Sequence, residues 1–243
     1  MSELEIEHGK ILAAREACKL VEGLGVVKVL GLGTGSTVRK FIDTCLHLLR
    51  NTKLVASSSD TVLYAKSLGL NVLDLLSVNS VDVYIDGADE VSGKLDLVKG
   101  RGAALFREKT IAYLSQTRIY VVDYTKYTGL DYLYVKPIPI EVVPAALNYV
   151  LKTVSRMGLF EPLVRKCAGK EGPVITDNNN YLVDLKPLQP IVDPSRVHYE
   201  LKRVHGVVES GIFPSGELVD VVVVGYADRA CILRKDAGDV KSA

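Results

Sequence analysis

Apolar residues along the chain recur at two spacings, one typical of helices and one typical of buried strands. Residues 9–24 repeat apolar positions at helical spacing, and the β-branched run 26–32 fits a buried strand. A glycine-rich turn (31–35) interrupts this run, and helical spacing returns over 37–49. Strand, glycine turn and helix in this order predict the first unit of a Rossmann-like domain.

The alternation continues to residue 123. The pattern predicts strands at 53–57, 81–85 and 118–122, and helices at 60–68 and 102–114. Strands that alternate with helices indicate a parallel sheet with helices on both faces.

The pattern changes near residue 134. Residues 136–143 carry two prolines two positions apart, which favours an edge strand because proline has no N–H for the ladder. The elements expected next are a helix at 145–157, strands at 161–166 and 181–184, a helix at 194–203 and a strand at 206–213. This β-α-β-β-α-β order predicts a ferredoxin-like module.

These patterns together predict an α/β fold with two domains. A Rossmann-like domain with a mostly parallel sheet takes residues 1–132 plus 213–243, where the apolar run 218–224 returns to the sheet. A smaller α+β ferredoxin-like domain, residues 133–212, is inserted before the last strands.

Composition and charge exclude several classes of protein. With 48% hydrophobic and 24% charged residues, the chain is neither disordered nor fibrous. The net charge is +1, without the basic excess of a nucleic-acid binder. The first ten residues are acidic and no apolar run could span a bilayer, so we expect no membrane association and a cytoplasmic location.

Cysteine and histidine spacing gives no sign of a metal site. No two cysteines form a C-x-x-C pair, and the histidines are not grouped with them. We therefore expect four buried, reduced thiols and no metal ligands; the cysteines are Cys18, Cys45, Cys167 and Cys231.

Four short motifs carry candidate chemistry. A glycine turn, Gly33-Thr34-Gly35-Ser36-Thr37, joins a strand to a helix, where backbone N–H groups attract an anion. It matches neither a nucleotide P-loop nor the full dinucleotide fingerprint, and a plain capped turn is an equally good interpretation. The other three motifs are Asp86-Gly87-Ala88-Asp89-Glu90, Lys99-Gly100-Arg101-Gly102 with Glu108 in the following helix, and Asp123-Tyr124-Thr125-Lys126.

Each of these motifs alone could be a surface turn. All four, however, follow the carboxyl ends of successive predicted strands, where open α/β sheets bind ligands. We therefore expect them to converge on one pocket that binds a small anion. That pocket would hold carboxylates, lysines and hydroxyl groups, but no nucleophilic Ser or Cys paired with His.

Over almost its whole length the chain resembles the type A ribose-5-phosphate isomerases. Seven matching segments follow the order of the family: GTGST (33–37), DGADE (86–90), KGRGAALFREK (99–109), VVDYTK (121–126), PIPIEVVP (137–144), TDNNNY (176–181) and GVVESGIF (206–213).

The resemblance implies interconversion of ribose 5-phosphate and ribulose 5-phosphate in the pentose phosphate pathway. It implies no metal or organic cofactor, and a homodimer or homotetramer. Glu108 is similar in position to the family's proton-transferring base. The residues similar to its substrate-binding loops are Thr34, Gly35, Ser36, Thr37, Asp86, Gly87, Ala88, Asp89, Lys99, Gly100, Arg101, Gly102 and Lys126.

Two positions depart from the family pattern. Arg101 stands where the family usually has glycine, so a positive φ there would cost about 1 kcal/mol or more. With an ordinary φ, Arg101 would point outward or add charge near the phosphate. Asn179 also replaces a common glycine, a milder change because Asn tolerates left-handed conformations.

An aldose–ketose isomerase moves a proton between C2 and C1 through a cis-enediolate, and one carboxylate can do both transfers. We expect Glu108 to be this base, with Lys99 and Asp86 or Asp89 at the reacting oxygens and the glycine turn or Lys126 at the phosphate. The alternatives are a sugar-phosphate sensor, which would bind without turnover, and an amino-sugar phosphate deaminase or a CoA transferase. The lack of a His-centred site disfavours the deaminase.

Overall fold

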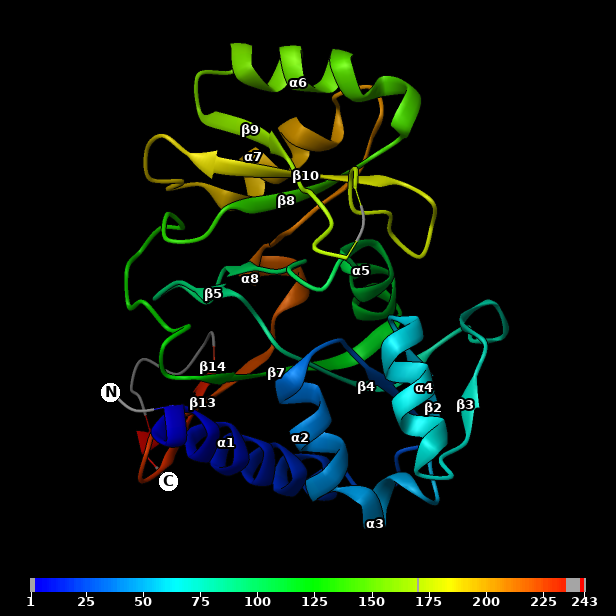
Figure 1. Cartoon of the computed structure of the whole chain (residues 1–243). Helices are drawn as coiled ribbons and strands as arrows, with labels where there is room; N and C mark the ends of the chain where they lie inside the picture. Colours follow the sequence, from blue (N-terminus) through cyan, green and yellow to red (C-terminus); the bar gives the residue numbers. More distant parts are fainter. Residues whose placement is uncertain (1–2, 170, 235–240, 243) are drawn as a thin grey trace. The chain divides into compact units, whose positions relative to one another are not determined.

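The computed structural model describes residues 3–169, 171–234 and 241–242. By its internal contacts the chain divides into two compact units (Figure 1). The first contains residues 1–88, 107–127 and 218–243, and the second contains 89–106 and 128–217. Residues 89–106, 128–132 and 213–217, which the sequence pattern placed in the first domain, belong to the second unit. Among the described residues, no helix is both long and apolar enough to cross a membrane.

The first unit is built on an eight-stranded sheet with the order β15-β14-β13-β7-β4-β1-β2-β3. Neighbouring strands from β13 to β3 run parallel, and β14 and β15 are added antiparallel at one edge. The strands are β1 (Val29–Leu32), β2 (Lys53–Ala56), β3 (Val72–Leu73), β4 (Val81–Asp86), β7 (Ser115–Asp123), β13 (Val221–Gly225), β14 (Ala230–Arg234) and β15 (Lys241–Ser242). This sheet confirms the predicted Rossmann-like architecture.

Helices of the first unit bury small and apolar side chains. In α1 (Glu3–Gly23), the buried residues include Ala13, Ala14 and Ala17, so α1 packs closely on α2 and on β7 and β13 (Figure 1). The remaining elements are α2 (Ser36–Thr44), α3 (Leu46–Leu49), α4 (Ser59–Ser67), α5 (Leu105–Leu114), which begins in the second unit, and a 3₁₀ turn at Leu75–Ser77.

The prediction of four reduced cysteines is wrong for Cys18 and Cys45, which form a disulfide between α1 and the end of α2. Their Cα atoms are 5.8 Å apart, although 27 residues separate them in sequence. Packing of α1 on α2 creates this proximity, which the spacing along the chain does not reveal. Cys167 and Cys231 are free thiols.

The second unit contains an antiparallel sheet of order β11-β8-β10-β9. Together with its helices it forms the predicted ferredoxin-like module, in which α6 and α7 share one apolar core with the sheet. Its elements are β8 (Ile138–Val142), a 3₁₀ turn (Pro144–Ala146), α6 (Leu147–Arg156), β9 (Phe160–Val164), β10 (Tyr181–Pro187), α7 (Pro194–Lys202) and β11 (Val207–Ser210).

The prediction of an edge strand at 136–143 is wrong, because β8 lies between β11 and β10. Pro139 pairs with Asp184 of β10, and its carbonyl oxygen accepts a hydrogen bond from the Gly211 N–H (2.6 Å). The N–H and the carbonyl group of a strand residue point to the same neighbouring strand, so an N–H at position 139 would also point toward β11. On that side β11 has already ended at Ser210. A proline is tolerated there because no ladder partner is lost.

The predicted strand 206–213 is divided between two sheets. β11 ends at Ser210, whereas β12 (Ile212–Phe213) pairs with β6 (Leu97–Val98), which in turn pairs with β5 (Glu90–Val91). The chain changes sheets at Gly211, where a side chain would overlap the Lys99 carbonyl. A short helix, α8 (Ser215–Leu218), follows.

Candidate active site

Three turns follow the carboxyl ends of neighbouring parallel strands in the first unit. Leu32 of β1 pairs with Ile85 of β4, and Asp86 pairs with Tyr120 of β7, so the three strands end at the same edge of the sheet. The turns that follow are 33–37, 86–88 and 123–126. This edge carries the sequence-predicted candidates of the first unit.

The turn after β1 depends on two glycines. Gly35 precedes α2 with φ 117°, a conformation that side chains rarely adopt. At Gly33 a side chain would overlap the carboxylate of Asp86. Beyond these glycines Ser36 is exposed and Thr37 is half-buried at the first turn of α2, and the Ser36 hydroxyl accepts a hydrogen bond from Lys10 Nζ (3.4 Å).

Asp86 is fully buried and organises this turn. Its Oδ1 accepts hydrogen bonds from the backbone N–H of Thr34 (3.2 Å) and of Gly87 (2.7 Å). Its Oδ2 accepts from the Tyr84 hydroxyl in a short hydrogen bond. One carboxylate therefore joins the turn after β1 to the turn after β4.

Two further side chains hold the same turn, one just after β2 and one in α4. The Thr61 hydroxyl donates to the Gly33 carbonyl oxygen (2.8 Å), and the Thr34 hydroxyl lies 2.8 Å from that of Ser57. Thr61 also donates its backbone N–H to the N-cap Ser58 (3.2 Å). The turn is thus fixed before any ligand arrives.

Glu108 lies in the first turn of α5 and is 2% exposed. Burial is the main reason why the pKa of Tyr84 is raised well above its ordinary value, and the negative charges of Asp86 and Glu108 raise it further. Burial and the Asp86 charge, with a contribution from Glu108, do the same for Tyr120. Both tyrosines are therefore neutral donors, and Glu108 is close enough for its charge to act on both.

Lys126 lies in the turn after β7 and is half-buried. The turn is shaped by Asp123, whose Oδ1 accepts from the Thr125 N–H (3.0 Å) and, in a short hydrogen bond, from the Thr125 hydroxyl. The Lys126 N–H donates to the Asp123 carbonyl oxygen (3.0 Å).

The second unit contains the other candidates. Asp89 Oδ2 accepts from the Arg101 N–H (3.0 Å). Lys99 is 3% exposed, and its Nζ lies 5.4 Å from the centroid of the Phe213 ring. Its backbone N–H donates to the Gly211 carbonyl oxygen (2.8 Å), which anchors the segment on the strand switch.

The segment after Lys99 is held by Arg165, which the sequence analysis did not identify. Arg165 Nη1 donates to the carbonyl oxygens of Gly100 (2.9 Å) and Arg101 (3.0 Å), while its Nε donates to Asp184 (2.8 Å). No sequence motif marks Arg165. Tyr84, also missed, precedes Asp86 by two residues on β4, and period-two spacing places them on one face.

Arg101 is exposed and has an ordinary φ. Within the described part of the chain, the non-glycine residues with positive φ are Leu95, Ala103 (60°) and Asn179 (62°). The first alternative for Arg101, a strained left-handed backbone, is therefore wrong. Asn179 adopts the left-handed conformation that the sequence analysis allowed for it.

The structure thus groups the predicted residues within each unit. The first unit brings together Thr34, Gly35, Ser36, Thr37, Asp86, Gly87 and Glu108, with Ala88 and Lys126 at the same sheet edge. The second unit holds Asp89 and Lys99 with Gly100, Arg101 and Gly102.

Comparison with known proteins agrees with the sequence motifs. The family profile of ribose 5-phosphate isomerase A (phosphoriboisomerase A) matches residues 53–229. The chain is 40% identical to the ribose-5-phosphate isomerase A of Pyrococcus horikoshii over 228 residues, which cover 91% of this chain and 96% of the relative.

Solved structures give the same result. Ribose 5-phosphate isomerase A from Methanocaldococcus jannaschii superposes with a TM-score of 0.84 at 34% identity, covering 94% of this chain and 99% of the other. A D-ribose-5-phosphate isomerase in complex with phospho-erythronic acid superposes with a TM-score of 0.86 at 38% identity and the same coverage.

Proposed function

Because the chain belongs to the ribose 5-phosphate isomerase A family, we propose that it interconverts ribose 5-phosphate and ribulose 5-phosphate. The observation that supports this proposal most strongly is the buried carboxylate of Glu108. The charges of Glu108 and Asp86 act on the same two buried tyrosines, and Asp86 organises the glycine turn at the carboxyl ends of the strands. A carboxylate is what proton transfer between neighbouring carbons requires.

We assign the phosphate of the substrate to the Gly33–Thr37 turn. Backbone N–H groups at the start of the nine-residue helix α2 are exposed to an anion, and the positive end of the helix dipole favours it. The Ser36 and Thr37 hydroxyls add donors. Lys126, at the same sheet edge, supplies a positive charge for the same group.

The proposed reaction is a proton transfer with Glu108 as base. The Glu108 carboxylate takes the proton from C2, the C1 carbonyl oxygen gains negative charge, and a cis-enediolate forms. The same carboxyl group returns the proton to C1. The proton of the C2 hydroxyl passes to O1, so that C1 becomes a hydroxymethyl group and the carbonyl group is now at C2. We assign Lys99 and Asp89, which the resemblance places in substrate-binding loops, to the reacting oxygens, where a cation and a hydrogen-bonding carboxylate would stabilise the enediolate.

The sequence led us to expect Asp86 or Asp89 at the reacting oxygens of the substrate, but we give Asp86 a structural role. Its carboxylate already accepts hydrogen bonds from two backbone N–H groups and a tyrosine hydroxyl. We therefore assign Asp86 to hold the phosphate turn in place, and not to exchange protons with the substrate. The resemblance implies that no metal or organic cofactor takes part.

Phospho-erythronic acid, the ligand of one solved relative, suits this proposal chemically. Its planar carboxylate, next to a hydroxylated and phosphorylated chain, resembles an enediolate in shape and charge. We expect this chain to bind it more tightly than ribose 5-phosphate, as transition-state analogues do.

The test is to incubate EDTA-treated protein with ribose 5-phosphate in heavy water and to follow ketose formation and deuterium at C1 by NMR. Ketose with deuterium at C1 supports a metal-independent enediolate isomerase. Binding without turnover would instead indicate a sugar-phosphate sensor. Turnover that requires added metal would contradict the absence of a cofactor.

We also propose that the enzyme works in the cytoplasm, as the acidic first ten residues and the lack of a long apolar run favour. The resemblance implies that it is a homodimer or homotetramer. Light scattering on the eluted peak of a size-exclusion column distinguishes two and four chains from one.

A further inference from the structure

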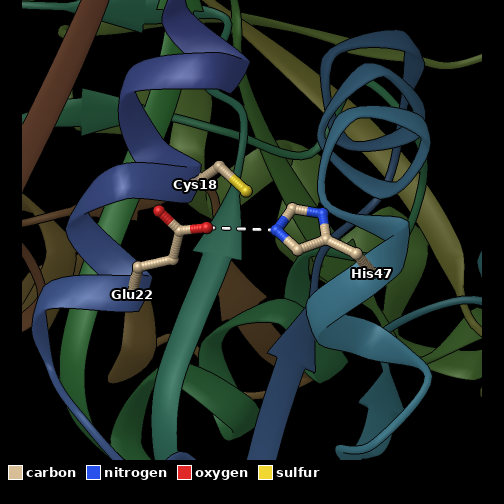
Figure 2. Close-up of side chains that lie close together, drawn as sticks. All are labelled: Cys18, Glu22 and His47. Carbon is tan, nitrogen blue, oxygen red and sulfur yellow. Dashed lines mark hydrogen bonds and ion pairs between the residues drawn. The ribbon is translucent and has the colours of Figure 1, made fainter.

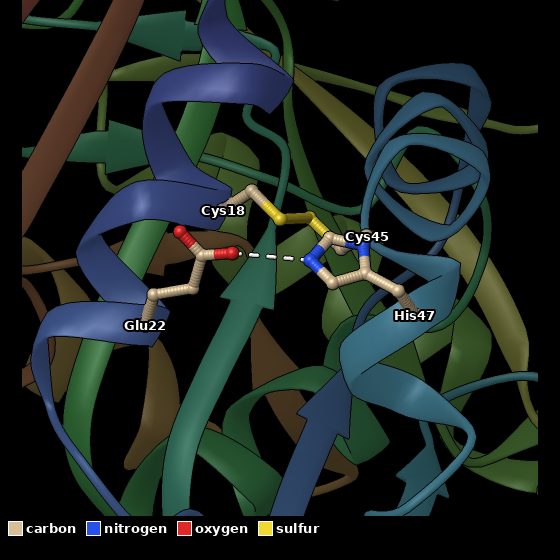
Figure 3. Close-up of a disulfide and its surroundings, with 4 residues drawn as sticks. All are labelled: Cys18, Glu22, Cys45 and His47. Carbon is tan, nitrogen blue, oxygen red and sulfur yellow. Dashed lines mark hydrogen bonds and ion pairs between the residues drawn. A yellow bond between two sulfur atoms is a disulfide. The ribbon is translucent and has the colours of Figure 1, made fainter.

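Four side chains with metal-binding donor atoms gather where α1 meets the junction of α2 and α3 (Figure 2, Figure 3). Cys18 and Glu22 lie one turn apart on the same face of α1. Cys45 ends α2, and His47 follows two residues later in α3. This α1–α3 cluster lies at the opposite end of α2 from Gly33–Thr37, about 13 Å away along nine residues.

The distances between the donor atoms of the cluster are at most slightly longer than those between the ligands of one metal ion. One ligand atom each from Cys18, Glu22 and His47 lies within 4.8 Å of the other two, the only such group among the described residues. Glu22 Oε1 is 3.0 Å from His47 Nε2. The fourth donor, the sulfur of Cys45, is bonded to that of Cys18 (Figure 3). Zinc bonds of roughly 2.0–2.3 Å place tetrahedral ligands about 3.3–3.8 Å apart.

Burial divides the cluster into two halves. Cys18 is 5% exposed and Cys45 is fully buried, and both belong to the apolar core of the first unit. The side chains of Glu22 and His47 are 47% and 62% exposed. An ion could therefore enter past the two exposed side chains and reach the buried sulfurs with little rearrangement.

We propose that the α1–α3 cluster binds one Zn²⁺ when its disulfide is reduced, through two thiolates, one carboxylate oxygen and one imidazole nitrogen. This donor set suits zinc, which accepts sulfur, nitrogen and oxygen ligands in a tetrahedron. Calcium and magnesium prefer oxygen ligands throughout. The positive charge of the ion would offset the cost of burying two negative thiolates.

The two states of the cluster exclude each other. A dithiol reductant supplies two electrons and two protons, so that the S–S bond breaks, two thiols form and the reductant becomes a cyclic disulfide. Zn²⁺ then replaces the two thiol protons, which pass to solvent. Either the disulfide or the zinc ion joins α1 to the end of α2, so the two helices stay linked in oxidising and in reducing conditions.

The test uses full-length protein, reduced with dithiothreitol and then freed of reductant and metal under argon. Titration with Co²⁺ reports sulfur ligation through thiolate-to-cobalt charge-transfer absorption, and Zn²⁺ is added afterwards to displace the cobalt. We expect one Co²⁺ per chain, displaced by one Zn²⁺. The disulfide form should show no such absorption.

Variants identify the ligands. Cys45→Ser should reduce the absorption by at least about half, because one of the two thiolates is lost, and His47→Ala should weaken Co²⁺ binding by more than the roughly 10- to 100-fold typical of an outer-shell partner. Cys167→Ser and Cys231→Ser, which change the free thiols, are the matched controls and should bind as the wild type does. If the protein does not fold when buried Cys45 is replaced, the Co²⁺ affinities of the His47→Ala and Glu22→Gln variants test the proposal, because both side chains are exposed.

Zn²⁺ should also raise the melting temperature of the reduced protein, but not that of the disulfide form. Three results would overturn the proposal: no charge-transfer absorption in the reduced protein, undiminished absorption in Cys45→Ser, or unchanged affinity in His47→Ala and Glu22→Gln. Isomerase activity and circular dichroism check that each variant is folded, because the cluster is remote from the phosphate turn.

Discussion

The hydroxyl of Tyr84 should contribute more to stability than that of Tyr120. Both rings are fully buried and contact each other edge to face, with centroids 6.2 Å apart. The Tyr84 hydroxyl donates to the carboxylate of Asp86, whereas that of Tyr120 donates to the carbonyl oxygen of Leu218 (2.9 Å). A hydrogen bond to a charged group contributes about 1.5–3 kcal/mol, compared with about 0.5–1.5 kcal/mol for a neutral pair.

Substitution by phenylalanine removes only the hydroxyl in each case, so the two variants are matched controls for each other. At about 2–4 °C per kcal/mol for a chain of this size, we expect Tyr84→Phe to lower Tm by about 3–12 °C, and Tyr120→Phe by about 1–6 °C. Circular dichroism is the suitable signal because the chain has no tryptophan. Equal losses, or a larger loss for Tyr120→Phe, would refute the role given to Asp86.

Three further predictions concern the two tyrosines, Gly33 and Arg165. Because the pKa values of Tyr84 and Tyr120 are raised in the folded protein, their stabilisation is complete below about pH 10 and is lost as the pH rises further. Between pH 10 and 11 the wild type should therefore lose about 2 kcal/mol more stability than the double phenylalanine variant does, as urea unfolding would measure. Gly33→Ala should place a methyl group on the Asp86 carboxylate, cost about 1–3 kcal/mol and lower activity; a normal melting curve would contradict this. Arg165→Met should release the segment after Lys99 and lower kcat/KM about 10- to 100-fold, and unchanged kinetics would show that the segment holds its shape without the arginine.

Local signals in the sequence were sufficient for the main architecture. The alternation of apolar strands with helices predicts the parallel sheet, and the β-α-β-β-α-β order predicts the ferredoxin-like module. The antiparallel strands β14 and β15 and the two-residue strands β3, β5 and β6 were missed, because such short or irregular runs have no distinct periodicity.

The predictions from sequence failed where residues that are far apart in the chain contact each other. The change of sheet at Gly211 depends on the approach of the Lys99 backbone, which no local pattern encodes. The disulfide of Cys18 and Cys45 depends on the packing of α1 on α2. In the same way, the motifs indicated Asp86, but only the structure shows that its carboxylate joins two turns.

The most direct test of the account compares Glu108→Gln with the wild type, using Glu161→Gln, an exposed glutamate of β9, as the matched control. Ketose formation from ribose 5-phosphate gives kcat, and calorimetry gives the affinity for phospho-erythronic acid. We predict that Glu108→Gln lowers kcat by at least about 10²–10⁴-fold, retains ligand binding, and that the control keeps wild-type values. Near-normal turnover by Glu108→Gln would contradict the assignment of Glu108 as the base.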